Sequence, residues 1–381
     1  MKITMTAGIF PPDIGGPAKY VPRMAGSLAG KGHSVSVVCQ TGTASDPADA
    51  AYPFRLVRIH RHGPKPLLFV RTVLAIYRSC RTSDLLYVNG LALQAYLASR
   101  LSGVPMVCKV VGDYAWERAR NREWFRGDID AYQVAPKSPR FHLLELIRNL
   151  PLRRSIRIIV PSQYLKRLVS GWEGAASQKT IVVYNAVDKD SPGKAAQLAP
   201  FAGKTMITVC RLVPWKGVDS LIRVTARLKN VRLLILGDGP LRSRLEALTR
   251  EAEVAERVLF LGNVPASSVA DYLKQSDVFV LNSTYEGFPH VVLEAMAAKV
   301  AVVATSAGGT PELVEHGETG LLIPPGDEDA LKAALEGILS GSSQGVSLTE
   351  KASRNLEANF SWARTEESTE RALLDARGSQ R

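Results

Sequence analysis

The segment DVFVLNSTYEGFPHVVLEAMAAKVAVVATS, residues 277–306, contains two short apolar runs on either side of a glycine loop. The runs, DVFVLNS and VAVVATS, are rich in Val and have the length of buried parallel strands, which need no polar alternation because helices cover both faces. Between them, YEGFPHVVLEAM passes through Gly287 and Pro289 into an apolar stretch typical of a helix. The segment therefore predicts a strand, a helix and a second strand.

The same alternation extends over the whole chain. Further apolar runs are MITVC, RLLILG, VLFLG and GLLIP after residue 200, and KITMTAGIF, HSVSVVCQ, DLLYVNG, VPMVCKVVG and SIRIIVPS before it. Amphipathic stretches such as LRSRLEALTREAEV separate them, and the polar stretch 188–204 is the best linker candidate. We expect an α/β protein of two Rossmann-like, doubly wound parallel-sheet domains, residues 1–190 and 191–360, facing across a cleft.

Length and composition exclude several classes of protein. The chain has 381 residues, 46% of them hydrophobic and 22% charged, which suits two globular domains. Its apolar runs are too short to span a membrane and its N-terminus is too polar for a signal peptide, so we expect a cytoplasmic protein. Four scattered cysteines, without a CxxC or Cys/His cluster, predict neither disulfides nor a zinc site.

The net charge of +12 is unevenly distributed. Residues 1–190 carry 27 Lys and Arg against 13 Asp and Glu, or +14, which leaves 21 against 23, or −2, for the rest. Arginines alternate with apolar residues at 54–81 and 148–157. Nucleic acid is one possible partner, and a solvated face is the simpler reading for any single arginine. The interleaved apolar residues favour an anionic membrane, so we expect peripheral association with the inner face of the cell membrane and no nucleic acid.

Three glycine loops follow predicted strands and lead into helices that have proline in the first turn. They run through Gly15 and Gly16, through Gly287, and through Gly308 and Gly309. Free amides at helix starts attract anions, and glycine lets a ligand approach the backbone. One such loop often serves only a tight turn, but three in one chain indicate a phosphorylated ligand.

Two cations and two carboxylates complete the candidate site. Arg211 follows a strand and Lys216 ends the next loop, so both can neutralise a diphosphate without a metal, although surface salt bridges are the alternative for either alone. If a helix begins near Pro289, Glu286 precedes it and can bind a sugar, whereas Glu294 lies in its second turn and can bind a ribose. The D-x-D triplets lack supporting ligands, and we expect no metal and no cofactor.

Glu286 and Glu294 are separated by seven residues. In this pair of glutamates the chain resembles the retaining GT-B glycosyltransferases of family 4, the group 1 glycosyltransferases, whose signature is the same spacing. FPPDIGGPAKYV is similar to the family's N-terminal glycine loop, RLVPWKG to its Arg/Lys phosphate pair and LGDGPLRSRLE to the wall of its base pocket. VLFLGNV and TSAGGTPELVEHGETGLLIPPGD also match in order. The tail FSWARTEESTERALLDAR resembles the last helix of the family, which crosses back to the first domain at about 361–381.

The resemblance implies transfer of a sugar from a UDP- or GDP-sugar to a saccharide or polyprenyl-linked acceptor, with retention and without a metal, in polysaccharide or glycolipid biosynthesis. It implies catalytic roles for Glu286, Arg211 and Lys216. It further implies a donor site of Gly15, Gly16, Gly237, Asp238, Leu261, Phe288, Pro289, His290, Val291 and Glu294, and an acceptor site of Asp13, Asn89, Trp116 and Glu117. The alternatives are a soluble acceptor, or a GT-B protein that only binds sugar nucleotide or membrane.

The chain departs from the family at one position. Many relatives carry a histidine in a VHG-like segment of the N-terminal domain, but this chain reads KVVGDYAWERAR, with Val111 in that place. Valine can neither donate to a sugar hydroxyl nor take a proton. Asp113 at the same strand end, with Trp116 and Glu117 one helical turn on, can supply a carboxylate and an aromatic platform, so we predict a catalytic role for Asp113. The alternative is that Asp113 caps a helix beginning near Tyr114.

Overall fold

The computed structural model describes residues 1–13, 15–174, 176–187, 198–341 and 343–378, which form two compact units. Unit 1 comprises Met1–Tyr184 and Ala363–Arg381, and unit 2 comprises Asn185–Trp362. The boundary falls before the expected residue 190, because the last strand of unit 1 already ends at Val182. Most of the linker candidate 188–204 lies outside the described residues.

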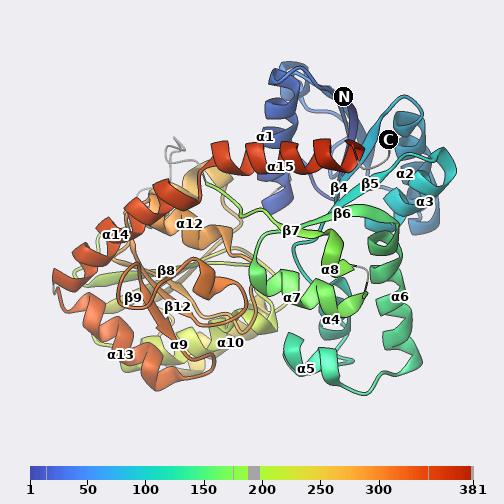
Figure 1. The fold of residues 1–381 in the computed structure, drawn as a ribbon. Coiled ribbons are helices and arrows are strands. Elements are labelled where there is room, and N and C mark those ends of the chain that lie inside the picture. The colour runs from blue at the N-terminus through green and yellow to red at the C-terminus, as the bar shows by residue number, and fades with distance from the viewer. Residues whose placement is uncertain (14, 175, 188–197, 342, 379–381) are drawn as a thin grey trace. The chain divides into compact units, whose positions relative to one another are not determined.

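Unit 1 is built on a seven-stranded parallel sheet in the order β3-β2-β1-β4-β5-β6-β7. The strands are β1 (Lys2–Ala7), β2 (Ser34–Thr41), β3 (Arg55–His60), β4 (Leu85–Asn89), β5 (Met106–Lys109), β6 (Ser155–Val160) and β7 (Thr180–Val182). The helices are α1 (Gly16–Gly30), α2 (Lys65–Cys80), α3 (Ala92–Ser102), α4 (Tyr114–Asn121), α5 (Ile129–Val134), α6 (Pro139–Arg154), α7 (Gln163–Trp172), α8 (Ala176–Lys179) and most of α15 (Trp362–Gly378). Helix α1 lies on one side of the sheet and α2 and α3 lie on the other (Figure 1).

The loops after β1 and β4 lie at the switch point of the sheet of unit 1. The chain adds strands outward from β1 to β3 and then returns to β4 beside β1, so the direction of winding reverses between these two strands. Thr6 Oγ1 donates to the carbonyl of Gly90 at 2.8 Å across this point. Ligands of doubly wound sheets bind at such a switch point, and Asp13 and Asn89 follow or end its two strands.

The sequence pattern did not predict β3 or β7. Strand β3 has the sequence RLVRIH, whose alternating arginines we interpreted as membrane-facing. The guanidinium of Arg58 is instead buried, lies 2.5 Å from Asp49 and donates to the carbonyl of Pro11 at 2.7 Å. This hydrogen bond from Arg58 lowers the pKa of Asp49 below its ordinary value. The membrane-facing interpretation is therefore wrong for Arg58, which holds the loop after β1 in place.

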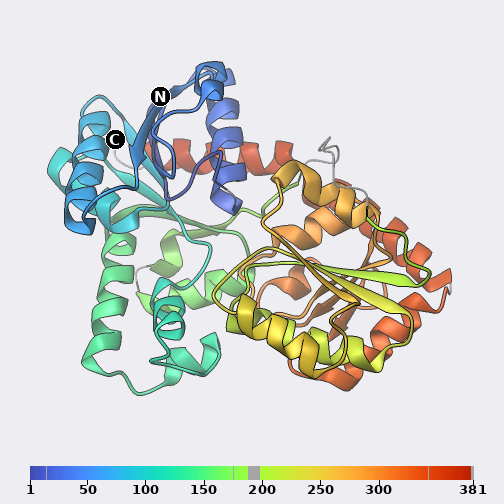
Figure 2. The same cartoon turned by 180° about the vertical axis from the view of Figure 1, so that it is seen from behind.

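Unit 2 is built on a six-stranded parallel sheet in the order β10-β9-β8-β11-β12-β13. The strands are β8 (Lys204–Val209), β9 (Val231–Leu236), β10 (Val258–Gly262), β11 (Val278–Leu281), β12 (Ala301–Thr305) and β13 (Leu321–Ile323). The helices are α9 (Val218–Arg227), α10 (Arg242–Glu251), α11 (Val269–Lys274), α12 (His290–Ala297), α13 (Glu328–Leu339) and α14 (Ser343–Asn359). Helices α9, α10 and α13 cover one face, and α12 and α14 cover the other (Figures 1 and 2).

The segment 277–306 folds as predicted, into β11, α12 and β12. Its strands lie in the core of unit 2, where Val280, Val303 and their neighbour Met206 of β8 are fully buried. The winding of this sheet reverses between β8 and β11, which are adjacent although β9 and β10 lie between them in the chain. The loops after β8 and β11 consequently meet at the carboxyl edge of the sheet, where ligands bind in this class of fold.

The C-terminal helix α15 packs on α1 within unit 1, as the resemblance implied. Glu366 accepts hydrogen bonds from Arg23 at 3.0 Å and from Ser27 at 2.8 Å. One turn later, Glu370 lies 2.6 Å from Lys31 Nζ. The tail is held in unit 1 mainly by its buried face, and the partly exposed ion pairs add only a little to this packing. The buried residues of this face are Thr365, Thr369, Ala372, Leu373 and Ala376.

Candidate functional site

An ion pair between Lys216 and Glu286 lies at the switch point of unit 2. Lys216 ends the short helix η2 (Pro214–Lys216) after β8, and its Nζ lies 2.5 Å from Oε1 of Glu286. Ser283 Oγ donates to the same oxygen at 2.6 Å. Within the described part of the chain nothing donates to Oε2 of Glu286, so this second oxygen can accept a hydrogen bond from a ligand.

The loop that carries Lys216 is fixed to the end of β11 through Gly217. Asn282 Nδ2 donates to the carbonyl of Gly217 at 2.9 Å. A Cβ on Gly217 would lie 2.3 Å from the carbonyl oxygen of Asn282, and its φ of +60° disfavours any L side chain. Glycine is therefore required here, and the backbone contact that it permits places Lys216 beside the glutamate loop.

The backbone of Glu286 is held by the glycine loop after β12. The N–H of Gly309 donates to the carbonyl of Glu286 at 2.9 Å. A Cβ on Gly308 would lie 2.0 Å from that oxygen, and Gly308 also has a φ of +60°. This pair of glycines therefore fixes the position of Glu286, and anion binding by its loop stays a prediction.

Positive potential at this edge comes from Arg211 and from the start of α12. Arg211 follows β8, is exposed, and forms no ion pair with any residue that the structure describes. Pro289 precedes α12, and among the described residues no side chain caps this helix, which begins with His290 and Val291. Glu294 lies in the second turn, as predicted. Arg211, Lys216 and the amide end of α12 together are a favourable environment for a diphosphate.

The other predicted donor residues lie on neighbouring loops of unit 2. Gly237 and Asp238 follow β9, and the N–H of Gly237 donates to the end of β10 at 2.7 Å. Leu261 lies half-buried in β10. The ring of Phe288 is buried and packs on Phe360, with 5.8 Å between the ring centroids. The side chain of Phe288 thus anchors the loop before α12, and only its backbone remains a candidate for donor contact.

Three residues of this site were not found from the sequence. Asn282 and Ser283 directly follow β11. Polar residues directly after a buried parallel strand are candidates for ligand contact, so their position in the sequence could have indicated them. Thr310 follows the glycine pair, and its hydroxyl is buried without a hydrogen-bond partner among the described residues. Because an unpaired buried hydroxyl is costly, Thr310 is a further candidate for ligand contact.

The predicted acceptor residues lie in unit 1, and so do Gly15 and Gly16, the two glycines of this unit that were predicted to bind the donor. Gly15 precedes α1 and Gly16 begins it. Asp13 is engaged, because Arg61 Nη2 lies 2.5 Å from its carboxylate. Asn89 ends β4, and its side-chain nitrogen is buried without a partner in the described chain. Asn89 therefore retains a donor that a ligand could use, whereas Asp13 holds the loop after β1.

Asp113 is fully buried at the start of α4, and both of its carboxylate oxygens are occupied. Oδ1 accepts from the N–H groups of Ala115 at 2.9 Å and Trp116 at 3.3 Å, which caps the helix. Oδ2 accepts from Arg148 at 2.8 Å and from Gln133 at 3.1 Å. The structure therefore corrects the catalytic prediction for Asp113 in favour of the capping alternative.

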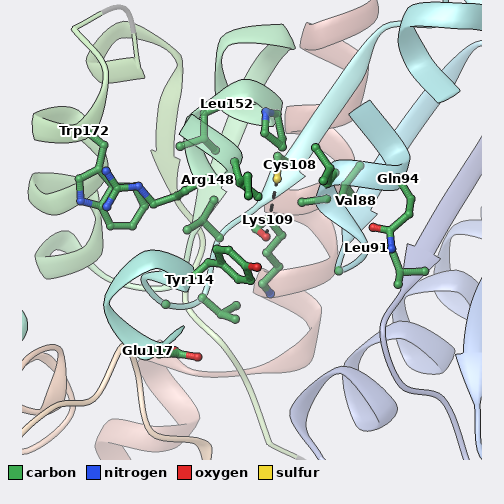
Figure 3. Close-up of a pocket in the computed structure, with 18 of the residues that line it drawn as sticks. Val88, Leu91, Gln94, Cys108, Lys109, Tyr114, Glu117, Arg148, Leu152 and Trp172 are labelled. Atoms are coloured by element: carbon green, nitrogen blue, oxygen red, sulfur yellow. Dashed lines mark hydrogen bonds between the residues drawn. The ribbon is translucent and has the colours of Figure 1, made fainter. Parts of the chain in front are cut away.

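Trp116 and Glu117 differ in whether their side chains are accessible to a ligand. The indole of Trp116 is fully buried and donates to the carbonyl of Gly127 at 3.3 Å, so it cannot offer a platform to a sugar. Glu117 is half-buried and lines a cavity of unit 1 (Figure 3). Of the three residues proposed to replace the family histidine, only Glu117 faces a space that a ligand could occupy.

The D-x-D triplets have structural explanations where they are described. Asp128 caps α5 by accepting from Ala131 at 2.7 Å, and Asp327 caps α13 by accepting from Ala330 at 2.8 Å. The third triplet, 188–190, lies outside the described residues. Among the residues searched, which are the described ones, no group of three or more His, Cys, Asp or Glu is placed to hold a metal ion.

Comparisons with known proteins identify the family. A family model for group 1 glycosyl transferases matches residues 194–355, and the model for Glycosyltransferase Family 4 matches residues 14–191. The two matches together cover most of both units. The chain belongs to the family 4, group 1 glycosyltransferases.

Individual relatives agree with this family. The chain is 29% identical to an uncharacterized glycosyltransferase of Methanocaldococcus jannaschii over 239 residues, which cover 59% of this chain and 60% of that protein. It is 25% identical to a GDP-mannose-dependent alpha-(1-6)-phosphatidylinositol monomannoside mannosyltransferase of Mycobacterium tuberculosis, over 95% of each chain. The structure of Anabaena Alr3699/HepE in complex with UDP and glucose matches 98% of this chain and 100% of that one, with a TM-score of 0.78 at 20% identity, and shows the GT-B fold.

Replacing Asp113 by alanine should destabilise this glycosyltransferase by about 3–5 kcal/mol, because the Arg148 guanidinium would stay buried without its partner. Urea unfolding followed by circular dichroism measures the loss. Asp128→Ala is the matched control, since it removes only an exposed helix cap, worth about 1 kcal/mol. Loss of sugar transfer at unchanged stability would instead restore the catalytic role of Asp113.

Proposed function

We propose that this glycosyltransferase moves a sugar from a UDP- or GDP-sugar to a saccharide or lipid-linked saccharide, with retention at the anomeric carbon, in polysaccharide or glycolipid biosynthesis. The observation that carries the proposal is the pair of Lys216 and Glu286, 2.5 Å apart at the switch point of unit 2. UDP and glucose in the HepE complex, and GDP-mannose in the name of the mycobacterial relative, support a nucleotide-sugar donor.

The protein's contribution to the reaction is electrostatic. Arg211, Lys216 and the amide end of α12 bind the leaving diphosphate, whose negative charge grows as its bond to the sugar breaks. Interactions that strengthen with this charge lower the barrier to transfer. Because these groups already carry positive charge, the scheme requires no metal ion.

The two glutamates orient the donor. Oε1 of Glu286 is fixed by Lys216 and Ser283, so Oε2 is presented in a defined direction to the hydroxyls of the donor sugar. Glu294 on α12 accepts hydrogen bonds from the ribose. The bond between the anomeric carbon and the diphosphate oxygen breaks, the acceptor oxygen attacks the same face, and its proton passes to the departing phosphate oxygen. The scheme uses no protein nucleophile.

Lys216→Met should lower kcat by about 100-fold or more and change KM less, because its charge is needed most in the transition state. Steady-state kinetics with UDP- and GDP-sugars measure the change. Lys229→Met, at an exposed lysine of the same unit, is the control. A change confined to KM would contradict the catalytic role. Nucleotide binding without transfer or donor hydrolysis by the unaltered protein would favour the binding-module alternative that Val111 raises.

Helix α2 presents an exposed amphipathic face in unit 1. Leu67, Val70 and Leu74, spaced by three and four residues, are 54%, 51% and 42% exposed. Arg71 and Arg78 are exposed on the same side of the helix. We propose that this face lies on an anionic membrane, with its apolar side chains among the lipids and its arginines at the headgroups. None of the described helices combines the length and apolarity of a membrane span.

Leu67→Gln combined with Leu74→Gln should weaken binding to phosphatidylglycerol vesicles about tenfold or more, because two exposed apolar side chains are lost from the contact. Vesicle co-sedimentation measures the affinity, which should also fall with added salt. Leu374→Gln is the control, since this leucine is 46% exposed on α15 of the same unit. Equal binding to phosphatidylcholine vesicles, or no difference between the variants, would count against the proposal.

A further inference from the structure

One aromatic side chain anchors the loop between Glu286 and α12. Phe288 lies two residues after Glu286 and directly before Pro289, which caps α12. Its ring is 5% exposed and packs on Phe360, with 5.8 Å between the ring centroids and 54° between the ring planes. Aromatic pairs favour such separations. The position of this loop therefore depends on a residue that directly follows another helix, α14.

Phe360 ends a row of buried side chains on α14. Leu348, Ala352 and Leu356 precede it at intervals of four residues, and all three are buried. Four-residue intervals keep side chains on one side of a helix. The N–H of Phe360 donates to the carbonyl of Leu356 at 2.9 Å, so helical hydrogen bonding continues to Phe360. Helix α14 therefore fixes the backbone from which the ring of Phe360 extends.

Helix α14 connects this aromatic contact to the core of unit 2. It covers the same face of the sheet as α12 and packs on α12 and β12 (Figures 1 and 2). Leu348 belongs to the core and lies about 18 Å from Phe360 along the helix, at 1.5 Å per residue. One end of the buried row thus lies in the core, and the other end contacts the loop that follows Glu286.

The aromatic contact also lies next to the point at which the chain leaves unit 2. Unit 2 ends at Trp362, two residues after Phe360, and α15 continues into unit 1. A shift of Phe288 either moves Phe360 with it or separates two buried rings. Separation is costly, because it exposes apolar surface to water. The contact therefore links the loop after Glu286 to the connecting segment 360–362.

We propose that Phe360 is a positioning residue of the donor site. It acts through Phe288, which it holds where Glu286 faces the donor sugar and the amide end of α12 faces the diphosphate. Through the same contact, donor binding and the order of the connecting segment 360–362 are coupled. The inference rests on the proposed function, because it assumes that the loop after Glu286 binds a nucleotide sugar.

Calorimetry with UDP and GDP on the full chain tests the inference with Phe360→Ala and Leu348→Ala. Each substitution removes a buried apolar side chain from the same row, so both should lower the melting temperature. Only Phe360→Ala should weaken nucleotide binding, by about tenfold or more, because only its cavity adjoins the donor loop. Phe360→Leu, which keeps an apolar side chain against Phe288, should recover most of the affinity. The titrations are made below the melting temperature of each variant.

A double-mutant cycle tests whether Phe360 acts through Phe288. Phe288→Ala should weaken nucleotide binding at least as much as Phe360→Ala does. The double variant should bind little more weakly than Phe288→Ala, because the contact is already lost. Losses of affinity that multiply in the double variant would overturn the proposal.

Hydrogen exchange tests the coupling in the unaltered protein and so does not depend on a variant that folds. The bound nucleotide should slow amide exchange at 360–362, because it restrains the loop on which Phe360 packs. The slowing should be lost in Phe288→Ala that is saturated with nucleotide. Exchange at 360–362 that the nucleotide leaves unchanged in the unaltered protein would overturn the proposal.

The outcome is separable from that of the proposed function. If the unaltered protein binds a nucleotide, and Phe360→Ala binds it as tightly as Leu348→Ala does, the positioning role is wrong and the transferase stands. If neither UDP nor GDP binds the unaltered protein and no sugar is transferred, the proposed function is wrong and the inference is overturned with it.

Discussion

Backbone contacts too close for any side chain decide where Lys216 and Glu286, the charged pair of the proposed donor site, lie. A Cβ on Gly217 or Gly308 would lie 2.3 Å or 2.0 Å from a carbonyl oxygen of the neighbouring loop. These two contacts join the loops after β8, β11 and β12, which the winding of the sheet already brings to one edge. The ion pair of Lys216 with Glu286 follows from this arrangement, and so does the direction in which the glutamate meets a ligand.

Sequence patterns predicted most of the fold because buried parallel strands are uniformly apolar. They failed for β3, an edge strand in which arginines alternate with apolar residues, and for β7, which has only three residues. Motif spacing likewise indicated Lys216 and Glu286, whose elements follow adjacent strands. It could not decide between the catalytic and the capping role of Asp113, because the arginine that occupies its second oxygen, Arg148, lies 35 positions later in the chain.

Four arginines of the N-terminal half show that its positive charge has more than one role. Arg58 and Arg148 are buried, and each is paired with a carboxylate inside unit 1. Their charge supports the loop after β1 and the start of α4. Arg71 and Arg78 are exposed beside the apolar residues of α2. Net charge alone is therefore a poor guide to membrane contact, and our proposal of such contact is restricted to α2, whose apolar side chains are also exposed.

The central claim is that glycine contacts at the switch point of unit 2 build the nucleotide-sugar site. Calorimetric titration of UDP and GDP into the unaltered protein, Gly308→Ala and Gly326→Ala tests it most directly. Both glycines have positive φ, but a Cβ on Gly326 would meet open space. We predict that one nucleotide binds the unaltered protein and Gly326→Ala alike and binds Gly308→Ala at least about tenfold more weakly. Equal affinity for the two variants, or no binding of either nucleotide, would contradict the account.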